Sequence, residues 1–165
     1  MNILERNTDL ESLLPMALIQ DHIYSNDPDQ LPLLEAYRLG AFDSGEKYLN
    51  RAIPRCKCEI YTEKQTLVLP YGGYAVVSVT DIDGNGLKFD FNRVTKRLSI
   101  NAQCPAYVVF NAGYDVLPGG LQLALLMAVA TAYENRESIS NGVSVAEIPI
   151  SHRKILDLYR LCGGD

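Results

Sequence analysis

Apolar residues dominate the stretch 118–137, which reads PGGLQLALLMAVATAYENRE. From Leu121 to Tyr133 only two polar residues interrupt the apolar run, and its Leu, Ala and Met are strong helix formers. Pro118 suits the first helical turn, where its missing N–H would have no partner. The run is shorter than the roughly 20 apolar residues that a bilayer requires. The pattern therefore predicts a central core helix near 118–137, ending in a polar segment.

A second helical pattern covers 31–53, because Leu34, Tyr37 and Ala41 begin a recurrence at 3–4 spacing, and Leu39 and Phe42 widen the apolar stripe. The opposite, charged face is expected to consist of Glu35, Arg38, Asp43, Glu46, Lys47 and Arg51. Pro54 ends this helix. Shorter helices are expected near 12–22 and 151–161, the second of them opened by Ser151 as an N-cap.

The period changes to two after Pro54, where Cys56, Cys58 and Ile60 alternate with polar residues. The residues Asp83-Gly84-Asn85-Gly86 then form a strong hairpin-turn signal. Strands are expected at 55–61, 66–69, 74–82, 87–91, 97–100 and 106–110. The sequence therefore predicts an α+β fold: a small helical bundle with an antiparallel sheet inserted at about 55–111. We expect one domain with a flexible tail at 1–7 and a mobile loop at 138–147.

Composition excludes several classes of function. The chain has 165 residues, of which 47% are hydrophobic, and a net charge of −5 without a block of either sign. A protein that grips nucleic-acid phosphates needs a clustered basic surface, which this pattern does not provide. The first residues lack the basic and apolar segments of a signal peptide, so we expect synthesis in a reducing cytoplasm.

No motif for catalysis or cofactor binding emerges, and we predict neither an enzyme nor a bound cofactor or metal. The two histidines, His22 and His152, belong to no nucleophile or zinc motif. The cysteines at 56, 58, 104 and 162 fit neither a disulfide framework nor zinc-ligand spacing. Asp81, Asp83 and Asn85 match the first half of a calcium loop, but Asn92 stands where the bidentate Glu belongs. A hairpin turn is favoured there, and a calcium-dependent binding module remains an alternative.

Several fragments together resemble the head–tail connector, or head-completion adaptor, family of tailed bacteriophages. The fragments are Leu67-Val68-Leu69-Pro70, Val76–Thr80 with the following Asp83-Gly84 turn, Asn111-Ala112-Gly113-Tyr114, Leu117-Pro118, Tyr133-Glu134-Asn135-Arg136-Glu137, and the closing Ile148-Pro149 to Leu158-Tyr159-Arg160. Their order and spacing cover most of the chain. Gly72-Gly73 departs from the family, which often has Pro after the first Leu-Pro.

The resemblance implies a structural protein of the virion, located at the neck between head and tail and synthesised in the host cytoplasm. Such connectors form a ring, here expected to be dodecameric, beneath the portal protein. They extend the channel for passing double-stranded DNA without sequence-specific binding, and they give a docking platform for a stopper or tail-completion protein. The alternative within this class is a different neck component, itself a stopper or tail-completion protein. No membrane partner is expected.

The resemblance also directs attention to the polar end of the core helix and to the last helix. Tyr and Arg are enriched at protein interfaces. The expected subunit or portal interface consists of Glu134, Arg136, Glu137, Tyr159 and Arg160. For Tyr159, an ordinary contact within the core is an equal alternative, because a half-buried Tyr serves both purposes.

Overall fold

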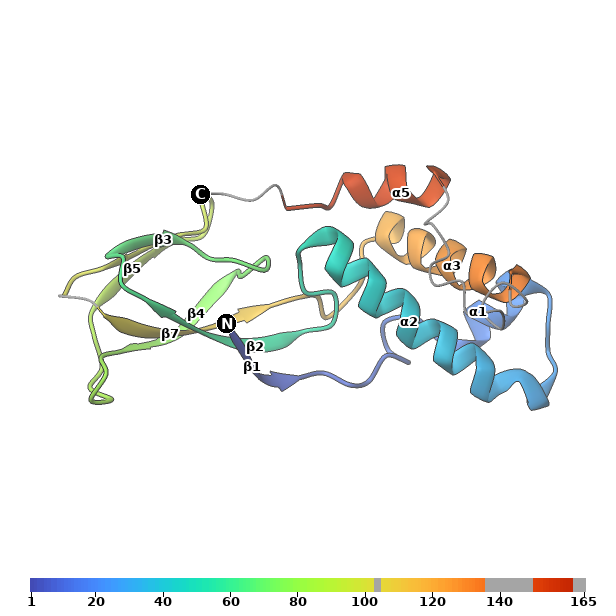
Figure 1. Cartoon of the computed structure of the whole chain (residues 1–165), viewed down its shortest axis with the longest axis horizontal. Helices are drawn as coiled ribbons and strands as arrows, with labels where there is room; N and C mark the ends of the chain where they lie inside the picture. The colour runs from blue at the N-terminus through green and yellow to red at the C-terminus, as the bar shows by residue number, and fades with distance from the viewer. Residues whose placement is uncertain (103–104, 136–149, 162–165) are drawn as a thin grey trace. The chain divides into compact units, whose positions relative to one another are not determined.

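Helices and strands occupy separate parts of the sequence, and the α+β class is confirmed. The computed structural model describes residues 1–102, 105–135 and 150–161. The chain divides into two compact units (Figure 1). The β unit is formed mainly by Met1–Thr8 and Asn50–Asp115. The helical unit is formed by the described parts of Asp9–Leu49 and Val116–Arg160.

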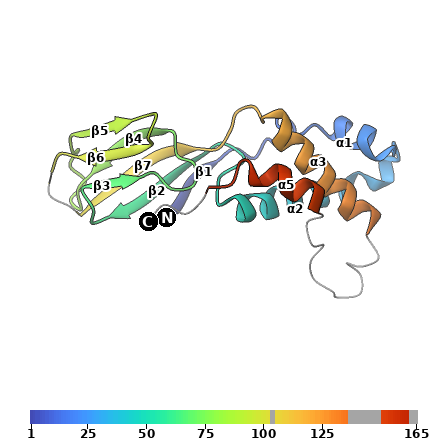
Figure 2. The ribbon, with the colours of Figure 1, turned by 90° about the horizontal axis from the view of Figure 1, so that it is seen from above.

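The described strands of the β unit form two antiparallel sheets rather than the single sheet expected from the sequence (Figure 2). One sheet has the order β1-β2-β7-β4, with β1 at Asn2–Arg6, β2 at Cys56–Thr62, β7 at Ala106–Ala112 and β4 at Ala75–Thr80. The other has the order β3-β6-β5, with β3 at Thr66–Val68, β6 at Arg97–Ile100 and β5 at Phe89–Asn92.

The amino-terminal residues are not a loose tail, which corrects the expectation for 1–7. β1 pairs antiparallel with β2, with an irregularity between Ile3 and Glu5, and the amide of Asn7 donates to the carbonyl of Arg55 at 2.8 Å. All five residues of β1 are exposed. The strand is therefore held by backbone hydrogen bonds at the sheet edge and contributes little apolar burial.

The two sheets share one apolar core. The alternation predicted for β2 is confirmed, because Cys56 and Cys58 are buried in this core, with their sulfur atoms 3.4 Å apart. Phe110 on β7 is fully buried at its centre, and Leu98 on β6 is buried from the other sheet. Because side chains from both sheets pack around Phe110, the two sheets of the β unit stack face to face on one core.

The Gly113 turn that follows β7 is fixed by backbone geometry. Gly113 has φ +85, and a Cβ on it would lie 2.2 Å from the carbonyl oxygen of Pro54. The next amide, of Tyr114, donates to the carbonyl of Ile53 at 2.9 Å. Only glycine tolerates this conformation at so close an approach.

The helical unit contains α1 (Met16–Ile23), the short 3-10 helix η1 (Pro28–Gln30), α2 (Leu31–Leu49), α3 (Gly119–Glu134) and α5 (Ile150–Asp157). The core helix is found as predicted, with Pro118 as its N-cap residue and with Leu121, Leu125 and Val129 buried. None of the described helices has the length and apolar character needed to cross a membrane. The predicted loop at 138–147 lies outside the described residues.

Three helices have boundaries that differ from the sequence expectation. α1 begins only after Pro15, because residues 12–14 form a turn in which Asp9 bonds the amide of Ser12. α2 ends at Leu49 instead of 53, and Asn50 adopts the left-handed region with φ 50. α5 already includes Ile150, so Ser151 lies inside the helix and is not its N-cap as predicted; the helix ends at Asp157, and turn hydrogen bonds continue to Arg160.

The charged face predicted for α2 is wrong at three positions, one of which, Arg51, lies beyond the end of the helix. Arg38 and Glu46 are buried, whereas Leu39, assigned to the apolar stripe, is exposed. Helical spacing identifies a stripe, but it does not tell how far neighbouring segments wrap around the helix.

Candidate interaction surfaces

The predicted interface residues lie in different settings within the helical unit. Glu134 is exposed at the end of α3, and Arg160 is exposed after α5. Arg136 and Glu137 lie outside the described residues. The predicted interface residues that the structure describes therefore do not form one cluster.

Tyr159 is half-buried against α3. Its hydroxyl oxygen would lie only 2.7 Å from a Cβ placed on Gly120, so the ring covers the glycine closely. This packing supports the alternative stated for Tyr159, a contact within its own unit. Gly119 and Gly120 are the first residues of α3, within the helix predicted near 118–137, and the absence of a side chain on Gly120 makes room for this ring.

Arg160 belongs to a cluster that the sequence did not reveal. The guanidinium groups of Arg153 and Arg160 lie 5.3 and 5.1 Å from the ring centroid of Tyr48 on α2. Arg153 also donates to the Tyr48 hydroxyl at 3.2 Å, and that hydroxyl donates to Asp157. Cation–π contacts of this kind fasten the end of α5 to α2 and still leave both arginines exposed.

A second network holds the segment before α1 onto α2. Arg38 donates to Glu11 at 2.6 Å and to the carbonyl of Leu14 at 3.0 Å, and it forms an ion pair with Glu35. Glu11 also accepts from the amide of Met16 at 3.0 Å. The Arg38 hydrogen bond, helped by the Met16 amide, lowers the pKa of Glu11. We refer to Arg38, Glu11, Glu35 and Leu14 as the Arg38 clasp.

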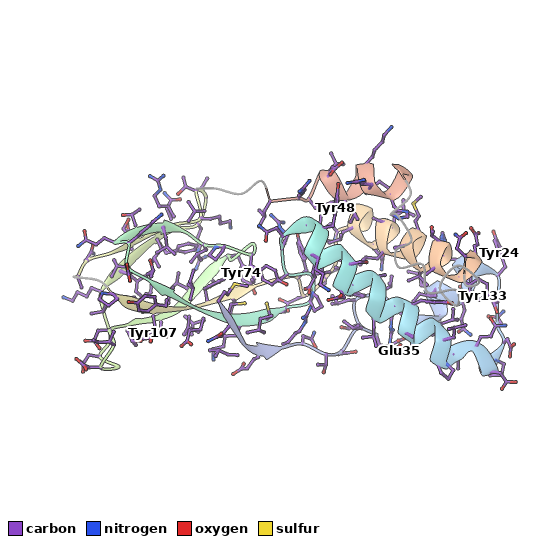
Figure 3. All side chains as sticks on the ribbon, in the orientation of Figure 1. Tyr24, Glu35, Tyr48, Tyr74, Tyr107 and Tyr133 are labelled. Atoms are coloured by element: carbon purple, nitrogen blue, oxygen red, sulfur yellow. The ribbon has the colours of Figure 1, made fainter. Side chains whose placement is uncertain are left out.

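The loop between α1 and α2 presents an aromatic side chain to solvent. Tyr24 is 97% exposed and has φ 55, and its amide donates to the carbonyl of Asp21. Gln30 accepts from the hydroxyl of Tyr133 at 2.7 Å and donates to Asp27 at 3.0 Å, which ties the loop to α3. Tyr24 and Tyr133 are found at the same end of the unit (Figure 3). We call Tyr24–Gln30 the tip loop.

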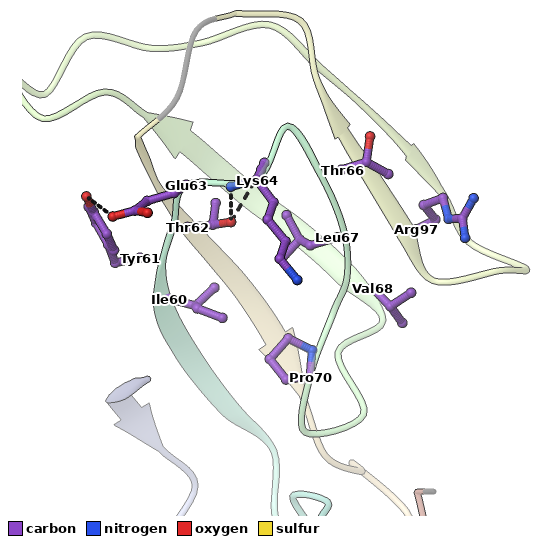
Figure 4. A pocket seen from close by; sticks show the side chains of 10 residues that line it. All are labelled: Ile60, Tyr61, Thr62, Glu63, Lys64, Thr66, Leu67, Val68, Pro70 and Arg97. Atoms are coloured by element: carbon purple, nitrogen blue, oxygen red, sulfur yellow. Dashed lines mark hydrogen bonds between the residues drawn. The ribbon is translucent and has the colours of Figure 1, made fainter. Parts of the chain in front are cut away.

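The β unit contains a groove of about 620 Å³ between the end of β2 and β3. Its apolar lining includes Ile60, Leu67, Val68 and Pro70, and its polar rim includes Tyr61, Glu63, Lys64 and Arg97 (Figure 4). We call it the β2–β3 groove.

Short-range hydrogen bonds hold the turn that follows β2, beside the groove. Thr62 accepts from the amide of Lys64 at 3.1 Å and donates to its carbonyl. The hydroxyl of Tyr61 donates to Glu63 at 3.4 Å, and burial together with this carboxylate raises the pKa of Tyr61. Tyr61 also packs edge-on against Tyr107, with ring centroids 5.5 Å apart.

The partial calcium motif has the geometry of a turn. One carboxylate oxygen of Asp81 accepts from the amides of Asp83 and Asn85, and the other accepts from the Asn85 side chain. The Asn85 side chain, followed by these amides, lowers the pKa of Asp81. Among the described residues no group of three His, Cys, Asp or Glu side chains is placed to hold a metal ion.

Comparison with known proteins gives matches at the level of structure only. No protein-family model matches the sequence, and no curated protein matches it. A chain from the virion of a native gene transfer agent (GTA) particle aligns with a TM-score of 0.69 at 19% identity. A chain from the neck of the empty GTA particle, computed with C6 symmetry, gives 0.68 at 18% identity.

A third similar chain comes from the neck of the native GTA particle, computed with C12 symmetry, with a TM-score of 0.66 and 19% identity. Each of the three alignments covers 99% of this chain and 99% of the other chain. The similarity therefore includes the complete fold, the β unit as well as the helical unit. At these identities it establishes a shared fold.

Proposed function

We propose that this chain is a structural component of the neck of a phage-like particle, and specifically a head–tail connector of the adaptor type. The observation that carries the proposal is the full-length structural match to chains of GTA necks. The sequence fragments that resemble connectors point independently to the same class. Because fold alone does not define function, the agreement of these two separate signals is what favours the neck.

The proposed assembly is a closed ring of identical copies. Two of the similar neck structures were computed with sixfold and twelvefold symmetry, which supports a ring for this chain as well. A ring requires one heterologous interface repeated around the axis, so each copy must carry two different, complementary surfaces. In this proposal the ring lies beneath a portal protein, as the expected dodecamer, and surrounds the DNA channel.

The charge of the chain suits a conduit. A net charge of −5 gives little attraction for DNA phosphates, so passing double-stranded DNA would not be retained. In the proposed ring the protein acts by its shape and by its two protein interfaces, one toward the portal and one toward a stopper or tail-completion protein. No reacting group is needed for that role.

A stopper or tail-completion protein is the second candidate, because the similar structures are identified as neck chains without a stated position. Binding to the portal separates the candidates. An adaptor is expected to bind isolated portal rings directly, whereas a stopper binds only when an adaptor ring is already present.

Deletion of the gene from the particle-producing source tests the proposal. We expect heads and free tails to accumulate unjoined, and addition of the purified chain to restore joined particles. Normal joined particles from the deletion strain would contradict a neck function.

A further inference from the structure

We infer that the tip loop of one copy docks in the β2–β3 groove of a neighbouring copy, with Tyr24 as the inserted side chain. The inference rests on the proposed ring, which requires two complementary surfaces on each chain. The tip loop belongs to the helical unit and the groove to the β unit. A contact between them in different copies is heterologous, the type that closes a ring.

Tyr24 is 97% exposed, so its aromatic ring contributes little to packing against the described residues of its own unit. It occupies the left-handed C-cap position of α1, where Gly or Asn is the usual residue. A bulky residue with positive φ is strained, and here its ring is also left in water. Burial of the ring in a partner would offset the free energy of the strained backbone and of the exposed ring. Buried Tyr side chains are frequent anchors of interfaces.

Hydrogen bonds within the helical unit hold the conformation of the tip loop in the unbound chain. The side chain of Gln30 accepts a hydrogen bond from the Tyr133 hydroxyl. The carboxylate of Asp27 accepts hydrogen bonds from the side chain of Gln30 and from the amide of Asp29, both at 3.0 Å. Ser25 donates to Gln30 at 3.4 Å. A loop held in its presented shape loses less conformational entropy on binding than a free one.

The groove offers a matching site. An apolar floor formed by Ile60, Leu67 and Pro70 can cover an aromatic ring, and the volume of about 620 Å³ leaves room for adjoining loop residues. In Figure 4 the side chain of Lys64 extends across the turn beside Leu67, and Arg97 lies beyond Val68. The outer edge of β3 has no strand paired with it among the described strands.

The charges of the two surfaces are opposite. No Lys or Arg occurs between Arg6 and Arg38, and the exposed acids Asp21, Asp27 and Asp29 surround Tyr24 in the sequence. The groove is lined by Lys64 and Arg97 and by one acid, Glu63, whose charged carboxylate accepts from the Tyr61 hydroxyl. Lys96, whose carbonyl accepts from the amide of Leu69, adds a third basic residue next to β3, and Asp90 lies in the hollow beside Val68 and Arg97, so basic residues outnumber acidic ones there. Opposite potentials favour this orientation of neighbours over others.

Photocrosslinking from position 24 tests the inference. The chain carrying Tyr24→p-benzoylphenylalanine is mixed with an isotope-labelled copy and irradiated, both as concentrated purified protein and in particles. We expect crosslinks between differently labelled copies, ending within residues 60–70 or at 97. Crosslinks confined to one copy, crosslinks to another protein or surface, or no crosslink in either sample would overturn the inference.

Charge reversal gives an independent readout that a purely structural role would not produce. We expect Tyr24→Ala to weaken association of copies at least about thirtyfold, as for an interface anchor, and Tyr24→Phe to change it little. Asp29→Lys and Lys64→Glu should each weaken it about three- to fivefold, and the double variant should restore it. Val116→Ala is the matched control, because Val116 is 81% exposed outside both surfaces.

Failure of the inference and failure of the proposed function give different results. If the chain forms a neck ring in particles but crosslinks from position 24 miss the groove, only the docking surfaces are wrong. If the chain is absent from particles, the neck function is wrong, and the purified protein alone then decides whether the tip loop docks in the groove.

Discussion

The β unit and the helical unit differ in what they bury. Among the described residues, the buried polar side chain of the β unit is Thr62, whereas the helical unit buries Arg38, Glu46 and His152. The β unit is therefore held mainly by apolar packing around Phe110, and the helical unit combines packing with charged networks. The stability of the two units should therefore depend differently on core cavities, on pH and on the loss of an ion pair.

The largest effect is expected from a cavity in the β unit. Phe110→Ala removes the largest fully buried side chain and should lower the free energy of unfolding by about 3–5 kcal/mol. Denaturant unfolding followed by hydrogen exchange would show the loss in the strands of the β unit. Val94→Ala, at a position that is 91% exposed in the turn between β5 and β6, is the control and should cost about 0.5 kcal/mol or less. Equal losses for the two variants would contradict the proposed core.

Breaking the Arg38 clasp should cause the next largest loss of stability, and this loss should occur in the helical unit. Arg38→Met keeps the aliphatic volume but leaves the carbonyl of Leu14 without its donor, at a cost of about 1–3 kcal/mol. Lys47→Met is the matched control, because the exposed Lys47–Asp43 pair contributes about 0.5 kcal/mol or less. Denaturant unfolding of both variants measures the difference, and a neutral Arg38→Met would show that the clasp contributes nothing.

The pH dependence should separate the units further. His152 on α5 is buried, its Nδ1 has no hydrogen-bond partner among the described residues, and burial lowers its pKa. The unfolded chain then binds a proton more readily than the folded one, so stability should fall as pH drops below about 6.5. We expect exchange protection to decrease in α5 and α3 before the strands of the β unit.

His152→Leu should remove this dependence between about pH 5 and 7. At lower pH the lowered pKa of Glu11 adds a second loss, because its carboxylate is stabilised only while it is ionised. Glu11→Gln should remove that second phase alone. A helical unit whose stability is flat from pH 7 to 5 in the unmodified chain would contradict the role assigned to His152.

The smallest effect concerns the seat of Tyr159 on α3. Gly120→Ala gains helix propensity of up to about 1 kcal/mol but brings a methyl group to 2.7 Å from the Tyr159 hydroxyl. We expect the single substitution to be close to neutral. Adding Tyr159→Phe removes the conflicting oxygen, so the double variant should be more stable than Tyr159→Phe alone by about 0.5–1 kcal/mol. Additive behaviour in this double-mutant cycle would show that the two residues do not touch.

The elements with strong local patterns were predictable from the sequence. The apolar run of α3 and the alternation of β2 each specify an element without knowledge of its partner. Strand β1 was missed because it is held by its pairing with β2, some fifty positions later in the chain, and not by a local pattern. The division into two sheets was missed for the same reason, since alternation fixes a strand's faces and says nothing about its neighbours.

The candidate surfaces were predictable only in part. The Arg38 clasp could have been suspected from the i,i+3 spacing of Glu35 and Arg38, but its third member, Glu11, comes from a different segment. The stacking of Arg160 on Tyr48 likewise joins residues far apart in the sequence. Such contacts depend on how the helices pack, which composition and periodicity do not determine.

The central claim, a ring of this chain in the neck, is tested most directly by electron cryomicroscopy of the head–tail junction of purified particles. We predict a ring directly beneath the portal into which both the β unit and the helical unit fit, with each copy contacting the next through two different surfaces. A resolved neck in which every density is accounted for by other proteins would contradict the account.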